Sequence, residues 1–207
     1  MPIEIKRPVY VCGENPGMTL YKPDTDQPIA IASYWHVTYS PHGVGNALVM
    51  WLDESTLFTS GIFTDNIPLA RLLMDTLTQH FPEFSDVPVS ALPYYEAACE
   101  HTFNDTDGYI VTCNSEKNKI VVKWAGLLDI KTLSWPGFPA GSKSFDLQNV
   151  ICPCNSGIIT INDQMMNGQV KTGTFSDNSP SSTAFLAFAE SWVGPHNNIS
   201  DNEGEEL

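Results

Sequence analysis

The stretch ASYWHVTYSP, residues 32–41, places a phenol and an imidazole two positions apart, at Tyr34 and His36. Its β-branched and aromatic residues indicate a strand, in which side chains two apart share a face. Together with Ala30 and Ala32, the two rings form a face with room for a ligand and with groups that exchange protons. We therefore take Tyr34 and His36 as candidate catalytic residues, with an ordinary half-exposed strand face as the alternative.

A second candidate stretch is ALPYYEAACEHTFND, which supplies Glu100 and His101. A buried carboxyl group has a raised pKa, and imidazole titrates near neutrality, so either residue is suited to proton transfer. Glu100 is equally consistent with a solvated outward face. Cys99 shares a face with His101, but two strand positions separate them by about 7 Å, too far for a direct thiol–imidazole hydrogen bond.

Aromatic side chains are the candidates for ligand contacts. The chain has five tryptophans. Trp51 and Trp124 lie in runs typical of central strands, and Tyr95 shares its strand face with His101. Such rings pack a core or wall a pocket for an apolar ligand, and both roles remain open for these three.

The sequence predicts no metal site and no bound cofactor. Cys152-Pro153-Cys154 has neither the spacing nor the second cysteine pair of a structural zinc site. The stretch from Asn162 to Gly168 lacks the spaced acidic ligands of a calcium loop. Phosphate-loop and nucleophile-elbow motifs are likewise absent from the sequence.

Charge and cysteine content restrict partners and location. The chain carries 24 acidic against 10 basic residues, a formal net charge of −14, so binding to nucleic acid or to an anionic membrane is disfavoured. The start of the chain has no secretory signal pattern, and no apolar run reaches the length of a membrane span. We therefore expect a soluble cytoplasmic protein whose five cysteines are reduced and mostly buried.

Short alternating runs separated by turn residues predict a mainly β protein. One segment differs, because residues 66–80 repeat leucines at helical spacing, with Asp65 or Asn66 available as a cap and Pro68 in the first turn. The expected strands lie near residues 8–12, 28–39, 45–53, 56–64, 94–103, 108–114, 118–125, 144–151, 157–162 and 169–174.

So many short strands predict an antiparallel sheet that closes or curves strongly into a barrel, with the long helix covering an apolar surface or an opening. A two-layer α+β arrangement is the alternative. We expect one β-rich domain over residues 1–193 and a disordered acidic tail over 194–207. Residues 181–193 fit either a short helix or a final strand.

These features favour a small-molecule-binding, barrel-like protein that acts on a hydrophobic ligand by acid–base chemistry, without metal or cofactor. An isomerase, hydratase or lyase fits this description. One alternative is a non-catalytic ligand-binding module with the same cavity. The other is a structural or interaction protein without a cavity. The sequence leaves the ligand and the oligomeric state open.

Overall fold

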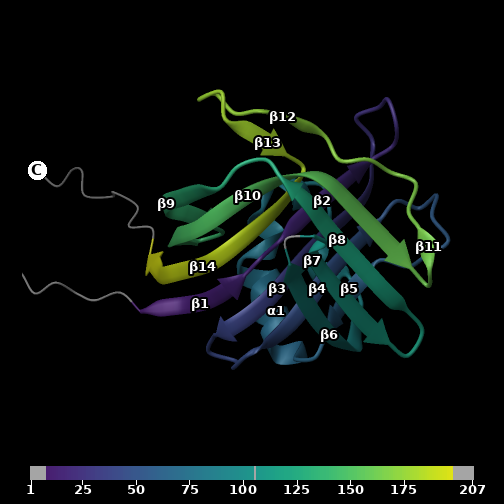
Figure 1. Cartoon of the computed structure of the whole chain (residues 1–207). Coiled ribbons are helices and arrows are strands. Elements are labelled where there is room, and N and C mark those ends of the chain that lie inside the picture. Colours follow the sequence, from purple (N-terminus) through teal and green to yellow (C-terminus); the bar gives the residue numbers. More distant parts are fainter. Residues whose placement is uncertain (1–7, 105, 198–207) are drawn as a thin grey trace, which may run out of the picture.

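The computed structural model describes residues 8–104 and 106–197, which form a large sheet curled into an uneven barrel (Figure 1). Hydrogen bonding closes a ring of nine strands in the order β14, β2, β3, β4, β5, β6, β7, β8 and β10, with β10 returning to β14. The strands are β1 (Val9–Glu14), β2 (Gly17–Tyr21), β3 (Pro28–Tyr39), β4 (Gly45–Leu52), β5 (Gly61–Thr64), β6 (Tyr94–Asn104), β7 (Gly108–Ser115), β8 (Lys119–Leu127), β9 (Lys131–Ala140), β10 (Lys143–Ile161), β11 (Gln164–Met165), β12 (Thr172–Thr174), β13 (Pro180–Ser182) and β14 (Ala184–Asn197). The predicted barrel-like, mainly β fold is confirmed.

The sheet is mixed rather than purely antiparallel. Within the described strands, β5 and β6 form a parallel pair, with Ile62 opposite Tyr94 and Thr64 opposite Glu96. Parallel neighbours cannot be joined by a tight turn, so a long crossover must connect them. That crossover contains the helix α1 (Ile67–Thr76) and three short 3₁₀ turns, Thr78–His80, Pro82–Phe84 and Val89–Ala91.

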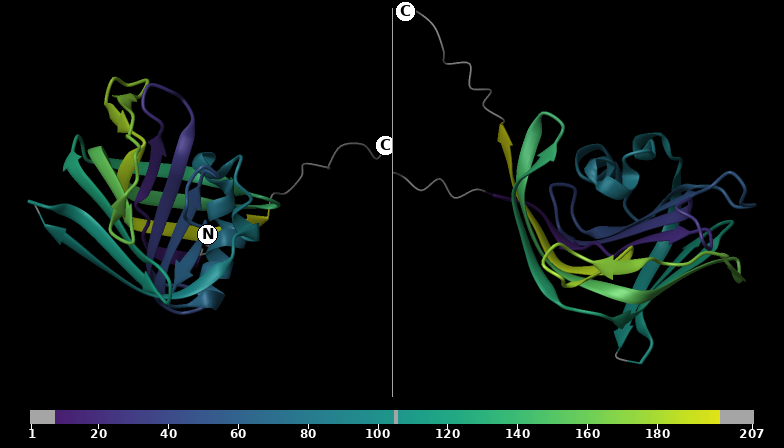
Figure 2. Two further views of the ribbon diagram at one scale, coloured as in Figure 1. Left: turned by 90° about the vertical axis from the view of Figure 1, so that its right-hand side faces the viewer. Right: turned by 90° about the horizontal axis from the view of Figure 1, so that it is seen from above.

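Helix α1 begins where the sequence predicts, at Ile67, but ends at Thr76, before the predicted end at residue 80. The Asn66 side chain accepts a hydrogen bond from the Leu69 amide, 3.1 Å away, and Pro68 occupies the first turn, where its missing amide hydrogen costs nothing. The last turn of the predicted helix is instead the 3₁₀ turn Thr78–His80, and Pro82 follows shortly after it. The buried residues of α1 face the sheet, and Figure 2 shows the helix outside the curled strands.

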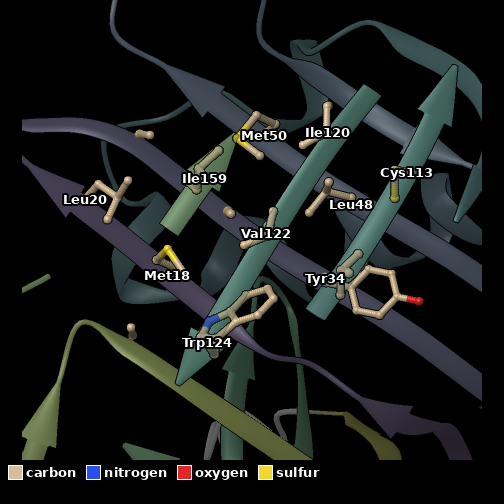
Figure 3. Packing of buried hydrophobic residues seen from close by; sticks show 14 of the residues in the cluster. Met18, Leu20, Tyr34, Leu48, Met50, Cys113, Ile120, Val122, Trp124 and Ile159 are labelled. Atoms are coloured by element: carbon tan, nitrogen blue, oxygen red, sulfur yellow. The ribbon is translucent and has the colours of Figure 1, made fainter. Parts of the chain in front are cut away.

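Two apolar cores lie on opposite faces of the sheet. The inner core fills the barrel, with Trp124 fully buried and its indole nitrogen donating to the Gly17 carbonyl at 2.8 Å. Tyr34 lies at the edge of this core, and Figure 3 shows its hydroxyl pointing away from the neighbouring apolar side chains. The outer core packs α1 and the turns after it against Trp35 and Trp192. Alternate residues of β3 therefore serve different cores, as the strand period requires.

Several strands differ from the sequence prediction. We did not predict β2, β11 or β9, which contains Pro136 and Pro139, and the strand expected at 56–64 is limited to β5. Proline removes a ladder donor and is tolerated at sheet edges, and β9 pairs only with β10 among the described strands. The two strands expected at 144–151 and 157–162 are one 19-residue strand, β10.

The end of the chain that fitted either a helix or a strand is the strand β14. It runs through residue 197, so the expected tail boundary at residue 194 falls inside it. The rest of that expected tail, residues 198–207, lies outside the described residues. Strand β14 pairs with β1, β2 and β10, which closes the barrel.

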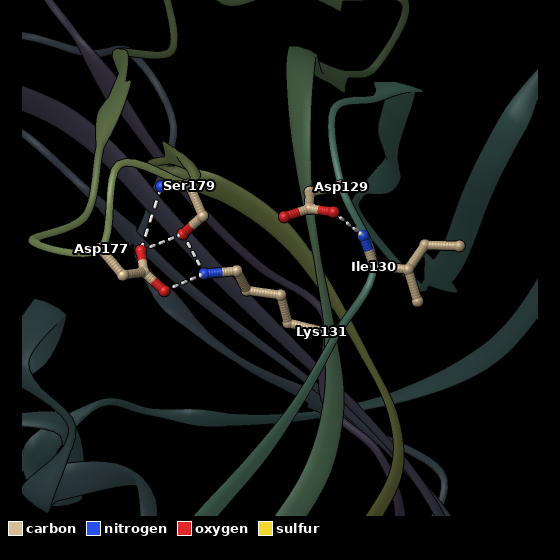
Figure 4. Close-up of polar contacts among 5 residues, drawn as sticks. All are labelled: Asp129, Ile130, Lys131, Asp177 and Ser179. Carbon is tan, nitrogen blue, oxygen red and sulfur yellow. Dashed lines mark hydrogen bonds and ion pairs between the residues drawn. The ribbon is translucent and has the colours of Figure 1, made fainter.

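The hairpin of β12 and β13 is attached to the barrel by a lysine. Lys131, at the start of β9, forms an ion pair with Asp177 at 2.9 Å and a hydrogen bond with Ser179 (Figure 4). Its ammonium group also lies 5.1 Å from the centre of the Phe175 ring. Hydrogen bonds from Ser179 and Lys131 hold the pKa of the Asp177 carboxyl well below its usual range.

The carboxyl group of Glu190 is buried beside Trp192 of the outer core. Glu190 of β14 is 3% exposed and accepts hydrogen bonds from Trp192 Nε1 at 2.7 Å and from Asn149 Nδ2 at 3.2 Å. Burial raises the pKa of Glu190 to about 7, with the nearby Glu83 carboxyl adding to the rise and the donors opposing it. The folded protein therefore favours the protonated carboxyl over the ionised one.

This burial predicts a pH-dependent stability. The contribution of Glu190 is fully present below its unfolded pKa, near 4.5, and is lost as the pH rises through about 7. The amide of the Glu190→Gln variant does not ionise. We therefore expect the unfolding free energy of this variant, relative to that of the wild type, to increase by roughly 3 kcal/mol as the pH rises over that range. Urea unfolding at several pH values measures the gap. Glu54→Gln, at an exposed position, is the control, and a gap independent of pH would contradict the prediction.

Candidate functional site

The barrel wall has a break where strand β5 ends. In register, Thr64 is the last β5 residue to pair with β4, opposite Ala47, and the last to pair with β6, opposite Glu96. The chain then leaves the sheet to start α1. Beyond that point Asn46 of β4 faces Cys99 of β6 without a strand between them, and its Nδ2 donates to the Cys99 carbonyl at 3.4 Å. We call this place the wall break.

Asn46 is held at the wall break by Asp65. The Asp65 carboxylate accepts one hydrogen bond from the Asn46 backbone amide at 2.7 Å and another from its side-chain Nδ2 at 2.6 Å. A carboxylate can only accept, so the amide must turn its nitrogen toward Asp65 and its oxygen the other way. The Asn46 oxygen then faces the barrel, where it meets Tyr34 and His36.

The direction of each hydrogen bond around Asn46 follows from that orientation. The Tyr34 hydroxyl donates to Asn46 Oδ1 at 2.7 Å, and His36 Nδ1 lies 2.9 Å from the same oxygen. An amide oxygen has no hydrogen to give, so His36 must carry its proton on Nδ1. In the neutral ring, Nε2 of His36 is then the basic nitrogen.

His101 joins the same chain of hydrogen bonds. Its Nδ1 lies 3.3 Å from the Tyr34 oxygen, whose own hydrogen is already given to Asn46. His101 therefore donates from Nδ1, and its Nε2 is also basic when the ring is neutral. The rings of His36 and His101 are 4.5 Å apart, centre to centre. Two imidazoles with the same tautomer thus stand side by side.

A tyrosine and a glutamate support His101 from the other side. The Tyr109 ring stacks on His101 with centres 5.3 Å apart, and its hydroxyl donates to Glu14 at 2.6 Å. Tyr109 is 1% exposed and Tyr34 is fully buried. Burial raises the pKa of both phenols, and the Glu14 carboxylate adds to the rise, so both stay protonated at neutral pH.

His101 is the histidine whose ionisation is disfavoured. Burial lowers its pKa below the ordinary value, the neighbouring His36 lowers it further, and the Glu14 carboxylate acts in the opposite direction. His101 is therefore a neutral imidazole near pH 7.

A groove of about 1040 Å³ lies beside the wall break. His36, Asn46 and Asp65 line it, whereas His101 stands behind His36. Its apolar wall comes from Val37, Val44, Ile67, Pro68, Ala97 and Ala98. The groove therefore offers one imidazole to a bound molecule, an apolar surface next to it, and no lysine or arginine in its described lining.

The structure brings together three of the four catalytic candidates. Tyr34, His36 and His101 form the cluster described above, although they come from strands far apart in the sequence. Glu100 is not part of it, because strand alternation puts its side chain on the opposite, exposed face of β6.

The three aromatic candidates for ligand contacts lie outside the lining of this groove. Trp124 is a member of the inner core, and Trp51 packs against the outer core. Tyr95 stacks on Phe63, with ring centres 5.1 Å apart, and lines a separate groove of about 880 Å³ near Leu57.

Four residues of the cluster were not predicted as site residues: Glu14, Asn46, Asp65 and Tyr109. Asn46 carried a signal, since it shares its strand face with Leu48 and Met50 and is therefore a polar residue at an inward position. Asp65 was considered only as a helix cap, a role that Asn66 takes instead. Glu14 reaches the cluster through long-range pairing of β1 with β3, for which the local sequence gives no signal.

The expectation of five reduced cysteines is wrong for two of them. Cys99 and Cys113 stand opposite each other on β6 and β7 and form a disulfide bond. This bond also removes Cys99 as a thiol partner for His101. Cys12, Cys152 and Cys154 are free, and the last two are buried as expected. Disulfides are typical of oxidising compartments, so the bond does not support the expected cytoplasmic location, which stays a prediction.

No group of three or more metal-ligating side chains occurs within the described part of the chain. Its helices are too short or too polar to cross a membrane. Compared with known proteins, the chain matches no protein-family model, no curated protein and no solved structure.

The environment of His101 predicts its titration. Followed by NMR, its midpoint should lie below the ordinary 6.5. His36→Gln should raise it, because the like charge disappears, and Glu14→Gln should lower it, because an opposing carboxylate is lost. His42→Gln, in the exposed turn between β3 and β4, should leave it unchanged. Shifts in the reverse directions would refute the arrangement.

Proposed function

We propose that the protein binds a small, partly apolar molecule in the groove beside the wall break and transfers a proton to or from it with His36. The observation that carries the proposal is the hydrogen-bond chain from Asp65 through Asn46 to His36, which sets the imidazole with Nδ1 protonated at the edge of a groove. An ordered imidazole with a known basic nitrogen, next to a binding space, is what general acid–base catalysis needs.

The chain's own residues suffice for the proton step. In the neutral ring, His36 Nε2 accepts a proton from the bound molecule, and the imidazolium so formed keeps its Nδ1 hydrogen bond to Asn46. Asp65 stabilises that cation through the Asn46 amide, to which it is bound. His101, whose ring centre is 4.5 Å from that of His36, is neutral and so places no second positive charge beside the imidazolium.

A base that readily returns its proton suits isomerisation or elimination. His36 can remove a proton from one carbon and deliver it to another atom of the same molecule, or to a leaving group. Such chemistry belongs to isomerases, lyases and hydratases. The carboxylates of Asp65, Glu96 and Glu116 along the groove disfavour an anionic substrate, so a neutral molecule with an apolar body is favoured.

A non-catalytic ligand-binding module is the second candidate. One observation favours it: the groove is wide and open to solvent rather than enclosed. Proton-transfer sites benefit from excluding water, which an open groove does not do. In this case the cluster orders the wall break, and His36 contributes a hydrogen bond to the ligand rather than a proton.

The two candidates are separated by hydrogen exchange into bound ligands. Neutral ketones with alkyl or aryl bodies are incubated with the protein in D₂O, and loss of their α-proton signals is followed by NMR. An acid–base catalyst accelerates the exchange of at least one ketone, and His36→Gln then slows it by about 100-fold or more. His42→Gln, exposed and outside the groove lining, should keep the wild-type rate.

Each contrary outcome has a definite meaning. Full exchange activity in His36→Gln would remove this residue from the mechanism. Ketones that bind, as shown by changes in tryptophan fluorescence, but exchange no faster than in buffer would support the non-catalytic module. Asn46→Ala should also slow exchange, because His36 loses the acceptor that sets its tautomer.

A further inference from the structure

We propose that the Cys99–Cys113 disulfide is a redox-sensitive positioning element: reduction by a dithiol releases β6 at the wall break and moves His101 away from His36. As a regulatory device, the inference rests on the acid–base site proposed above. Its structural part, the movement of His101, can be measured without any substrate.

The disulfide lies next to the residues that assemble the site. Cys99 precedes His101 by two positions on the same face of β6. Its carbonyl accepts the hydrogen bond from Asn46 that spans the wall break. A displacement of β6 at Cys99 therefore affects both the Asn46 contact and the imidazole two residues further along.

Strand β6 is held from one side only in this region. Its residues 94–96 pair with β5, whereas residues 97–104 extend past the end of β5 and pair with β7. The wall break leaves the other side of these residues without a strand among those described. The disulfide to β7 is thus a lateral tie at the place where the sheet supplies half of its usual support.

Packing decides which sulfur moves when the bond is broken. Two bonded sulfurs stand closer than two unbonded sulfurs can, so reduction forces them apart. Cys113 is fully buried in the inner core with Val111 and Ile120 and has no room to retreat. Cys99 is half-buried at the edge of the wall break. The displacement therefore falls on Cys99 and on β6.

The exchange reaction is chemically complete with a dithiol as reductant. One thiolate of the dithiol attacks the more accessible sulfur, Cys99 Sγ, and Cys113 leaves as a thiolate that takes up a proton. The second thiol of the reductant then displaces Cys99 and closes the reductant's own disulfide. Two electrons pass from the dithiol to the protein, which gains two thiols.

Movement of β6 changes the surroundings of His101. In the oxidised protein its Nδ1 contacts the Tyr34 hydroxyl, and its ring lies against His36 and Tyr109. Burial and His36 both lower the pKa of His101 in that position. Separation from either one raises it back toward the ordinary value.

The test is an NMR titration of the folded protein with and without dithiothreitol. We expect reduction to raise the His101 midpoint by on the order of half a pH unit and to leave His42 unchanged. The double variant Cys99→Ala/Cys113→Ala should show the raised midpoint without reductant and no response to it. Cys12→Ser, which removes a free cysteine, should behave as the wild type.

A count of the reactive thiols shows whether the disulfide is present and whether dithiothreitol has reduced it. The denatured, unreduced protein should have three reactive thiols, and the reduced protein all five. Five thiols before reduction would overturn the proposal, and so would an unchanged His101 midpoint in a folded protein whose count has risen from three to five. If the double variant fails to fold, the reductant experiment on the wild type decides alone. Absence of ketone exchange would count against the proposed function and not against the movement of His101.

Discussion

The paired hydrogen bonds between Asp65 and Asn46 are the interaction on which the polar end of this barrel depends. They decide which way the Asn46 amide faces, and through it the donor and acceptor of every bond out to Tyr34, His36 and His101. Without the carboxylate the amide could turn over, and the tyrosine hydroxyl and the histidine would face a donor instead of an acceptor. A single exposed aspartate therefore sets the tautomers of two imidazoles.

The same interaction exists because strand β5 is short. Asn66 caps α1 and Pro68 occupies its first turn, so the chain must leave the sheet directly after Thr64. Its departure removes one strand from the wall and leaves backbone and side-chain groups of β4 and β6 to find other partners. Asn46 meets this demand by bonding to Asp65 on one side and to the Cys99 carbonyl on the other. The site is thus a consequence of how the barrel accommodates its crossover helix.

Local patterns in the sequence predict the elements well and their partners poorly. Alternation in residues 30–36 puts Tyr34 and His36 on one strand face but does not say whether that face points inward, and helical leucine spacing predicts a helix where α1 lies. Strands β9 and β2 are hard to predict because they contain proline and glycine, which have a weak strand propensity. Pairing with neighbouring strands overrides that propensity in the folded protein. The meeting of His36 with His101 and the disulfide depend on register between distant strands, which no local pattern contains. His101 could be proposed as a candidate from its residue type and its strand position, whereas its partners Asn46 and Glu14 required the fold.

Strand β9 has a bearing on how copies of this chain behave toward each other. It lies at the margin of the sheet, joined to β10 alone among the described strands, and Trp135 on it is 46% exposed. A free strand margin with apolar side chains invites a neighbouring molecule to add its own strand, the route by which β proteins polymerise. Pro136 and Pro139 withdraw two of the amide hydrogens that such an addition would use. The same prolines that make β9 difficult to predict from the sequence thereby disfavour edge-to-edge polymerisation.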